Sequence, residues 1–145
     1  MVRQTSEEVR LFGMLRKVPL FSGLDGRELE SVAAAGREVS FVSGQKIITQ
    51  GEPGLSFLLV LEGKTEVRKR GKRIAMVEPG GFFGEMTVFD DKPRSADIVA
   101  VEPTKCFGIA SWSFFPVLRT NPGVAIGIIK ELVRRLRQLD ENSDM

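Results

Sequence analysis

The most constraining feature of the sequence is a series of short β-prone runs that fills residues 37–110 and is interrupted by glycine-rich turns. Gly44, Gly63 and Gly71 each lie between two such runs. Many short strands with frequent turn residues are typical of antiparallel barrels and jelly rolls. We therefore expect a mainly β fold, a jelly-roll β-roll (a double-stranded β-helix), with strands at 39–42, 46–49, 56–61, 65–69, 73–77, 96–101 and 105–109.

Helical patterns flank this β-rich stretch on both sides. Near the start, apolar residues recur at helical spacing, and Asp25 is positioned to cap a second short helix. After residue 110 the helical period returns, with Asn121 as an expected N-cap and Pro122 at the first helical position. The sequence predicts one domain over residues 1–145, made of N-terminal helices (1–36), the β-roll (37–110) and C-terminal helices (111–140).

The side-chain inventory excludes most kinds of enzyme. The chain has no histidine and one cysteine, Cys106. Without histidine there is no Ser-His or Cys-His pair and no imidazole ligand for a metal ion. Cys106 lies in a β-prone run and has no partner for an internal disulfide, so we expect a buried structural thiol. We expect no catalysis, no metal site and no cofactor.

Length, charge and hydropathy indicate a soluble domain. No apolar run approaches the roughly 20 residues that span a bilayer, and the N-terminal stretch lacks the apolar centre of a secretory signal. We therefore expect a cytoplasmic protein without membrane association. A net charge of +2 is too small to indicate an anionic partner by itself.

The last helix has an apolar seam. Its members are spaced by alternating intervals of four and three residues, as in a two-stranded coiled coil: Ala125, Ile129, Leu132, Leu136 and Leu139. This spacing predicts homodimerisation through the C-terminal helix. The alternative is a helix that packs only on its own roll.

The segment that most strongly indicates a binding function is residues 82–96, with the sequence FFGEMTVFDDKPRSA. It combines a glycine, a carboxylate (Glu85) and an arginine (Arg94) within one short segment. An arginine stays charged and donates in a fork that suits a phosphate, and a carboxylate can accept a hydrogen bond from a sugar hydroxyl. Backbone N–H groups at the start of a short helical turn add donors for an anion. Gly84 lets backbone approach a ligand closely.

This segment resembles the phosphate-binding cassette of cyclic-nucleotide-binding domains, and the resemblance extends along nearly the whole chain. The stretches VPLFSGL, FGEMTV, RSA, GIASWSF and NPGVAIGIIKELVRRL occur in the family's order. The family includes catabolite activators and the regulatory subunits of protein kinase A. The resemblance implies a non-enzymatic sensor that binds a cyclic nucleotide.

The resemblance also implies roles for individual residues. Glu85 corresponds to the acceptor for the ribose 2′-hydroxyl and Arg94 to the phosphate contact. Gly84, Met86 and Thr87 correspond to backbone contributors, and Ser95 to a hydroxyl near the phosphate. The remaining expected ligand contacts are an apolar wall beside the base and an arginine from the last helix: Val67, Ile74, Val77 and Arg135.

The sequence departs from the family's pattern in two respects. Thr87 fills a position that usually holds a smaller residue, and Leu139 and Asp140 stand where catabolite activators place hydroxyl residues that meet adenine. The base is then held differently, for example beneath Arg134 or Arg135 as a cation–π contact. Ser95 follows the arginine, and in the family this position favours cAMP over cGMP when it is Ala or Ser.

Other functions compete with the sensor hypothesis. A domain of the same fold can have lost its ligand and serve only in dimerisation, which would leave Glu85 and Arg94 as a structural pair. The basic run 68–73 could bind nucleic acid, but no aromatic residues interleave it for base stacking, so we expect none. Few residues follow the last helix, so we expect no helix-turn-helix here and an unidentified effector protein or fused domain as the partner.

Overall fold

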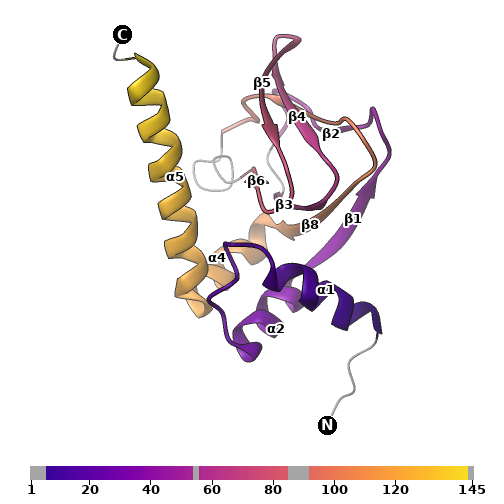
Figure 1. The fold of residues 1–145 in the computed structure, drawn as a ribbon, viewed down its shortest axis with the longest axis vertical. Coiled ribbons are helices and arrows are strands. Elements are labelled where there is room, and N and C mark those ends of the chain that lie inside the picture. Colours follow the sequence, from indigo (N-terminus) through magenta and orange to yellow (C-terminus); the bar gives the residue numbers. More distant parts are fainter. Residues whose placement is uncertain (1–5, 54–55, 85–91, 144–145) are drawn as a thin grey trace.

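The computed structural model describes residues 6–53, 56–84 and 92–143. The chain begins with two helices, α1 (Ser6–Arg16) and α2 (Gly26–Ala35), and ends with α4 (Ser111–Thr120) and α5 (Pro122–Ser143). Between them the described residues form eight strands: β1 (Gly36–Phe41), β2 (Lys46–Ile48), β3 (Ser56–Glu62), β4 (Thr65–Lys69), β5 (Lys72–Val77), β6 (Phe82–Phe83), β7 (Asp97–Ala100) and β8 (Thr104–Ala110). The predicted fold class, a β-roll with helices at both ends, is confirmed (Figure 1).

The strands form two four-stranded antiparallel sheets. One has the order β1-β8-β3-β6 and the other the order β2-β7-β4-β5. The helices α1, α2 and α4 gather at one end of the roll, and α5 stands alongside it (Figure 1). The short strand β6, which the sequence did not predict as a strand, pairs with the middle of β3 and lies on the side of the roll that faces α5 (Figure 1).

Strand β3 is buried on both faces. Phe57, Leu59 and Leu61 belong to the cluster that packs beneath the helices, whereas Leu58 and Val60 belong to the cluster inside the roll. Successive side chains of a strand point to opposite faces, so a strand covered on both sides has a continuous apolar run instead of an alternating one.

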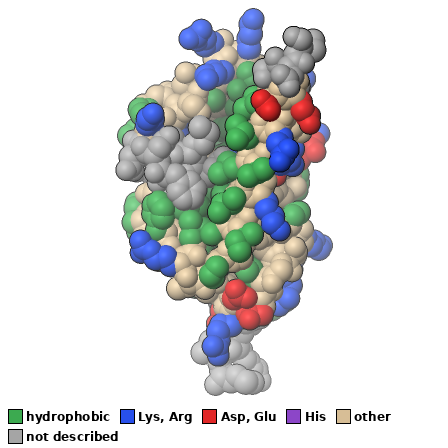
Figure 2. Space-filling model, turned by 90° about the vertical axis from the view of Figure 1, so that its left-hand side faces the viewer, with side chains coloured by type: hydrophobic (Ala, Val, Ile, Leu, Met, Phe, Trp, Pro, Cys, Tyr) green, Lys and Arg blue, Asp and Glu red, His purple; other side chains and the backbone are tan. Residues whose placement is uncertain are grey.

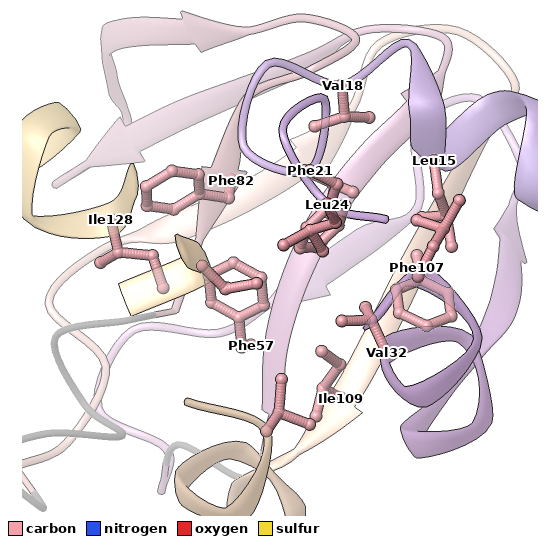
Figure 3. Close-up of a cluster of buried hydrophobic side chains, with 14 of the residues drawn as sticks. Leu15, Val18, Phe21, Leu24, Val32, Phe57, Phe82, Phe107, Ile109 and Ile128 are labelled. Atoms are coloured by element: carbon pink, nitrogen blue, oxygen red, sulfur yellow. The ribbon is translucent and has the colours of Figure 1, made fainter. Parts of the chain in front are cut away.

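Two interior clusters therefore hold the fold together. The larger joins the helices to the first sheet, and Figure 3 shows Ile128 of α5 near Phe57 and Phe82 within it. The smaller fills the roll and contains Cys106, which is buried as expected. Burial raises the pKa of the Cys106 thiol to about 12, so the sulfur stays protonated and unreactive at neutral pH.

The helix termini show one prediction that is confirmed and one that is wrong. Asp25 caps α2 by a capping box, in which its carboxylate accepts from Glu28 N at 2.8 Å and the Glu28 side chain accepts from Asp25 N. Asn121 precedes Pro122 as expected, but its side chain turns back and donates to Val117 O at 3.0 Å. It stabilises the end of α4, not the start of α5.

The basic run forms a tight hairpin between β4 and β5. Lys69 pairs with Lys72, so Arg70 and Gly71 are the two turn residues, and both have positive φ values (54° and 78°). Such two-residue turns match the twist of an antiparallel pair. The cations are exposed at the hairpin end, apart from the half-buried Arg68, which pairs with Glu66 at 3.0 Å.

No helix in the described part of the chain is long and apolar enough to cross a membrane. Within the same residues, no group of three His, Cys, Asp or Glu side chains could hold a metal ion.

Candidate ligand-binding site

A cavity of about 610 Å³ lies between the roll and α5. Its walls come from β4 and β5, from the segment around β6, from residues 94–96 and from one face of α5. Small-molecule sites in proteins are commonly concave, with volumes of about 300–1,000 Å³, and combine apolar walls with a few polar groups. The cavity has this composition and size.

Arg94 is the buried cation of the cavity. It is only 7% exposed, and its guanidinium donates to Ser56 O at 2.6 Å. Its backbone is fixed as well, because Arg94 N donates to Glu52 O and Arg94 O accepts from Gly51 N. The loop before β3 and the start of β3 thus hold this side chain in place at the cavity wall.

Gly84 lies directly against this guanidinium. Its φ of +94° is one that residues with side chains rarely adopt. A Cβ added there would lie 2.6 Å from one Arg94 guanidinium nitrogen (Nη1) and 2.7 Å from Ser56 O. The sequence-based argument was that Gly84 lets a ligand approach the backbone; the structure adds that Gly84 makes room for Arg94.

The other predicted ligand contacts divide into three groups. Ser95, Val67 and Val77 line the same cavity as Arg94 and Gly84. Ile74 does not line it and is 58% exposed. Glu85, Met86 and Thr87 lie outside the described residues.

A register shift in β5 accounts for the position of Ile74. Val67 pairs with Ala75, but the next residue, Arg68, pairs with Arg73, so Ile74 has no direct partner. An inserted residue of this kind changes which side chains face inward. Ala75 and Met76 of β5 line the cavity instead.

Arg135 joins α5 to the roll at this cavity. It is half-buried; its guanidinium donates to Phe82 O at 2.9 Å and lies 4.8 Å from the centroid of the Phe82 ring. It also contacts Glu131 on its own helix at 3.4 Å. One side chain therefore makes a hydrogen bond and a cation–π contact with the strand that precedes Gly84.

Glu131, Arg134 and Gln138 also line the cavity, and sequence reasoning did not assign them a binding role as a group. Arg134 pairs with the Glu131 carboxylate through two guanidinium nitrogens. Hydrogen bonding from Arg134, which is stronger than the opposing effect of burial, lowers the pKa of Glu131 below its ordinary value. Glu131, Arg134 and Gln138 follow one another on α5 at intervals of three and four residues. This spacing in the sequence could have shown that they share one face of the helix.

Comparisons with known proteins agree with the fold. The sequence model of the cyclic nucleotide-binding domain matches residues 38–121. Among curated proteins, the cyclic AMP receptor protein of Thermus thermophilus is 33% identical over 132 residues, which are 88% of this chain and 61% of that protein. A cAMP-dependent protein kinase regulatory subunit of Hypocrea atroviridis is 30% identical, over 86% of this chain and 25% of the other.

Solved structures of the same kind are similar in three dimensions. The catabolite activator protein of Thermus thermophilus has a TM-score of 0.79 at 33% identity and covers 87% of this chain, which spans 62% of that protein. The structure of cAMP-bound PfPKA-R has a TM-score of 0.80 at 26% identity and covers 93% of this chain and 47% of the other. The regulatory subunit of a cAMP-independent protein kinase A from Trypanosoma brucei has a TM-score of 0.78 at 25% identity, with 94% and 49% coverage.

This chain spans 61% and 25% of the two curated relatives, so each comparison concerns only a part of the relative. The family is defined by ligand binding and not by catalysis. With more than half of its residues matched, the chain belongs to the cyclic nucleotide-binding domain family.

Proposed function

We propose that this chain binds a cyclic nucleotide, cAMP in preference to cGMP, in the cavity between the roll and α5, and releases it chemically unchanged. The observation that carries the proposal is the buried guanidinium of Arg94 at the cavity wall, packed on Gly84. A cyclic phosphodiester has one negative charge, and a fixed planar guanidinium can donate two parallel hydrogen bonds to it.

The sugar-phosphate contacts in this proposal come from the segment 84–95. Arg94 binds the phosphate, and Ser95, an exposed hydroxyl at the same cavity, adds a donor. The role of Glu85 as acceptor for the ribose 2′-hydroxyl, and those of Met86 and Thr87 as backbone donors, rest on the sequence pattern alone. The base then lies against the apolar side chains of β4 and β5, namely Val67, Ala75, Met76 and Val77.

The choice of cAMP rests on Ser95 and is supported by the cAMP-bound relative PfPKA-R. The fold alone does not decide the ligand, because the similar Trypanosoma brucei protein is described as cAMP-independent. The proposal therefore has to be tested through the residues of this site.

Substitution of Arg94 tests the phosphate contact. Arg94→Gln retains an amide donor but removes the charge, and Arg94→Lys retains the charge but removes the fork. We expect the Gln variant to lose about 30- to 5,000-fold in cAMP affinity, the range for loss of one partner of a buried charge contact. The Lys variant should lie between it and the wild type.

Arg119→Gln is the matched control, since Arg119 is an exposed arginine on α4 away from the cavity. Circular dichroism and the urea midpoint report whether each variant is folded. A folded Arg94→Gln protein with unchanged cAMP affinity would exclude the proposed phosphate contact. A wild type that binds neither nucleotide would favour the alternative of a non-binding structural domain.

We further propose that α5 transmits the ligand's presence. The Arg135 contact to Phe82 connects α5 to the strand that precedes Gly84, so a ligand that moves this segment changes the position preferred by the helix. Such coupling shifts the population of states by no more than the ligand's preference between them. The receiver of that change is a second copy of the chain, an effector protein or a fused domain.

A further inference from the structure

The end of the β4–β5 hairpin, residues 68–73, is strongly basic and exposed; we call it the basic hairpin. Of its five cations, Arg68 is held in an ion pair, with Glu66. The other four make no ion pair or side-chain hydrogen bond with any residue that the structure describes: Lys69, Arg70, Lys72 and Arg73. These four charges are therefore available to an anion outside the chain.

The cations surround the end of the hairpin. Lys69 pairs with Lys72 and Arg68 with Arg73. Because paired residues of two antiparallel strands project to the same face and successive pairs project to opposite faces, each face has two cations, and Arg70 lies in the turn between them. The hairpin stands at the end of the roll opposite to α1, α2 and α4 (Figure 1), and Figure 2 shows Lys and Arg side chains gathered at this end.

Arg70 has an unfavourable backbone conformation for a residue with a long side chain. Its φ is +54°, and it is the non-glycine residue with positive φ in the described part of the chain. Glycine and asparagine are the residues that fit this position of a two-residue turn best. Strained backbone positions of this kind cluster at functional sites. The turn therefore has a cation at its tip where a residue better suited to the turn would be neutral.

An exposed isoleucine directly follows these cations. The register shift in β5 leaves Ile74 58% exposed, next to Arg73. The sugar–phosphate backbone of a nucleic acid offers little contact to such a side chain. A bilayer of anionic lipids offers both partners, charged headgroups and the acyl chains beneath them. The sequence-based expectation of no membrane association came from the lack of a spanning segment, and it placed Ile74 in the cavity.

We propose that the basic hairpin, together with Ile74, binds the surface of membranes that contain anionic lipids. The inference does not rest on the proposed function, because neither these cations nor Ile74 line the cavity. Each exposed cation near such a surface strengthens binding by about fivefold, and the partial burial of one isoleucine adds roughly 3- to 10-fold. The result is a reversible contact, with half of the chain bound at about 0.1–1 mM accessible lipid.

The test is co-sedimentation of the chain, without nucleotide, with vesicles of phosphatidylcholine alone or with about 30% phosphatidylserine. We expect binding only to the vesicles with phosphatidylserine, and its loss at about 1 M salt, where charges are screened. Arg70→Gly should weaken binding about fivefold without lowering the urea midpoint, since glycine adopts the positive φ readily. Ile74→Ala should weaken it roughly 3- to 10-fold.

Arg119→Ala and Val9→Ala are the matched controls, an exposed arginine on α4 and a 54% exposed valine on α1, and should leave binding unchanged. No binding of the wild type to phosphatidylserine vesicles, or equal binding by both hairpin variants, would overturn the proposal. A DNA duplex of about 20 base pairs is the second probe. If Arg70→Gly weakens binding to vesicles and duplex alike while Ile74→Ala affects neither, the hairpin binds polyanions in general and the membrane contact is wrong.

Discussion

At the scale of single residues, Gly84 is the position whose replacement has the most defined consequence. Gly84→Ala would put a Cβ on a backbone with φ of +94° and within 2.6 Å of the Arg94 guanidinium. We expect a loss of about 1–2 kcal/mol in the free energy of unfolding from the backbone alone, together with weaker cAMP binding as Arg94 is displaced. Urea denaturation and equilibrium binding measure the two effects.

Gly23→Ala is a suitable control for this substitution, because an added Cβ at Gly23 meets nothing within 4 Å. It should leave both quantities nearly unchanged. If Gly84→Ala were as stable as the wild type and bound cAMP equally well, the close packing of Arg94 on Gly84 would not matter for the site.

Asp97, two residues after Ser95, makes the stability of the fold depend on pH. Its carboxylate accepts from Gln50 N at 2.7 Å, and this hydrogen bond, together with the charge of Lys46, lowers the pKa of Asp97 below 3.8. Since the folded-state pKa is lowered, the unfolded chain binds more protons in this window. The stabilisation is therefore complete well above pH 3.8 and is lost as pH falls through the lower, folded-state value.

Asp97→Asn tests this dependence. The wild type should be more stable than the variant at pH 6, and the difference in free energy of unfolding should shrink by pH 3. Urea denaturation at the two values measures it. If the difference in the free energy of unfolding between wild type and variant were the same at pH 6 and pH 3, the ionised carboxylate would contribute nothing to stability. Gln50 precedes Gly51, which bonds Arg94 O, so loss of this contact also loosens the support of Arg94.

At the scale of elements, Arg135 attaches α5 to the roll. The neighbouring Arg134 makes no such contact with Phe82 and is therefore a suitable control for its substitution. Arg135 contacts Phe82, whereas Arg134 bonds Glu131 on its own helix. We expect Arg135→Ala to increase hydrogen exchange of amides in the second half of α5 and around Phe82. Arg134→Ala should leave the amides near Phe82 unaffected. Equal exchange in both variants would show that Arg135 does not connect helix and roll.

Several elements could be predicted from the sequence because local chemistry decides them. The run Ser56–Glu62 has β-branched and large apolar residues between turns, and it is a strand within one residue of the prediction. Asp25 has Glu28 three residues later, which is enough to specify a capping box. In these cases, neighbours in the chain supply the interactions, so a pattern of a few residues is sufficient.

Other features depend on contacts that the sequence does not display. Ile74 was expected beside the base, but the register shift opposite Val67 and Arg68 leaves it exposed. Asn121 has the chemistry of an N-cap, yet its burial against α4 turns the amide toward Val117 O. Gln138 enters the cavity lining only because α5 stands against the roll at a certain rotation. Each depends on pairing or packing between distant segments.

At the scale of the whole molecule, α5 presents an apolar stripe to the outside. Ile126, Ile129, Val133, Leu136 and Leu139 are all exposed, with Leu136 at 66%, and Figure 2 shows apolar side chains aligned along this face. Leu132 of the predicted seam instead packs toward the core, beside the buried Val124 and Ile128. The members of this stripe are three, four, three and three residues apart, close to the alternating three–four spacing of a helix pair. A second copy of the chain is the proposed occupant.

Leu136→Glu tests the proposed dimer. A carboxylate in the centre of an apolar helix pair is costly to bury, so we expect the variant to sediment as a monomer at concentrations where the wild type is a dimer. Arg27→Glu also introduces a carboxylate, at an exposed site on α2, and should not affect the mass even though it changes the net charge by more. A monomeric wild type at 100 micromolar or so would exclude a stable helix-mediated dimer, since that concentration lies far above the dissociation constant of such a pair.

The most direct test of the central claim, that the cavity between the roll and α5 holds a cyclic nucleotide, is a calorimetric titration of the wild-type chain with cAMP and with cGMP. The account predicts saturable heat with one cAMP per chain, a dissociation constant in the micromolar range or below, and weaker binding of cGMP. Absence of binding by both nucleotides would contradict it and would leave Arg94 as a structural cation in a roll without a ligand.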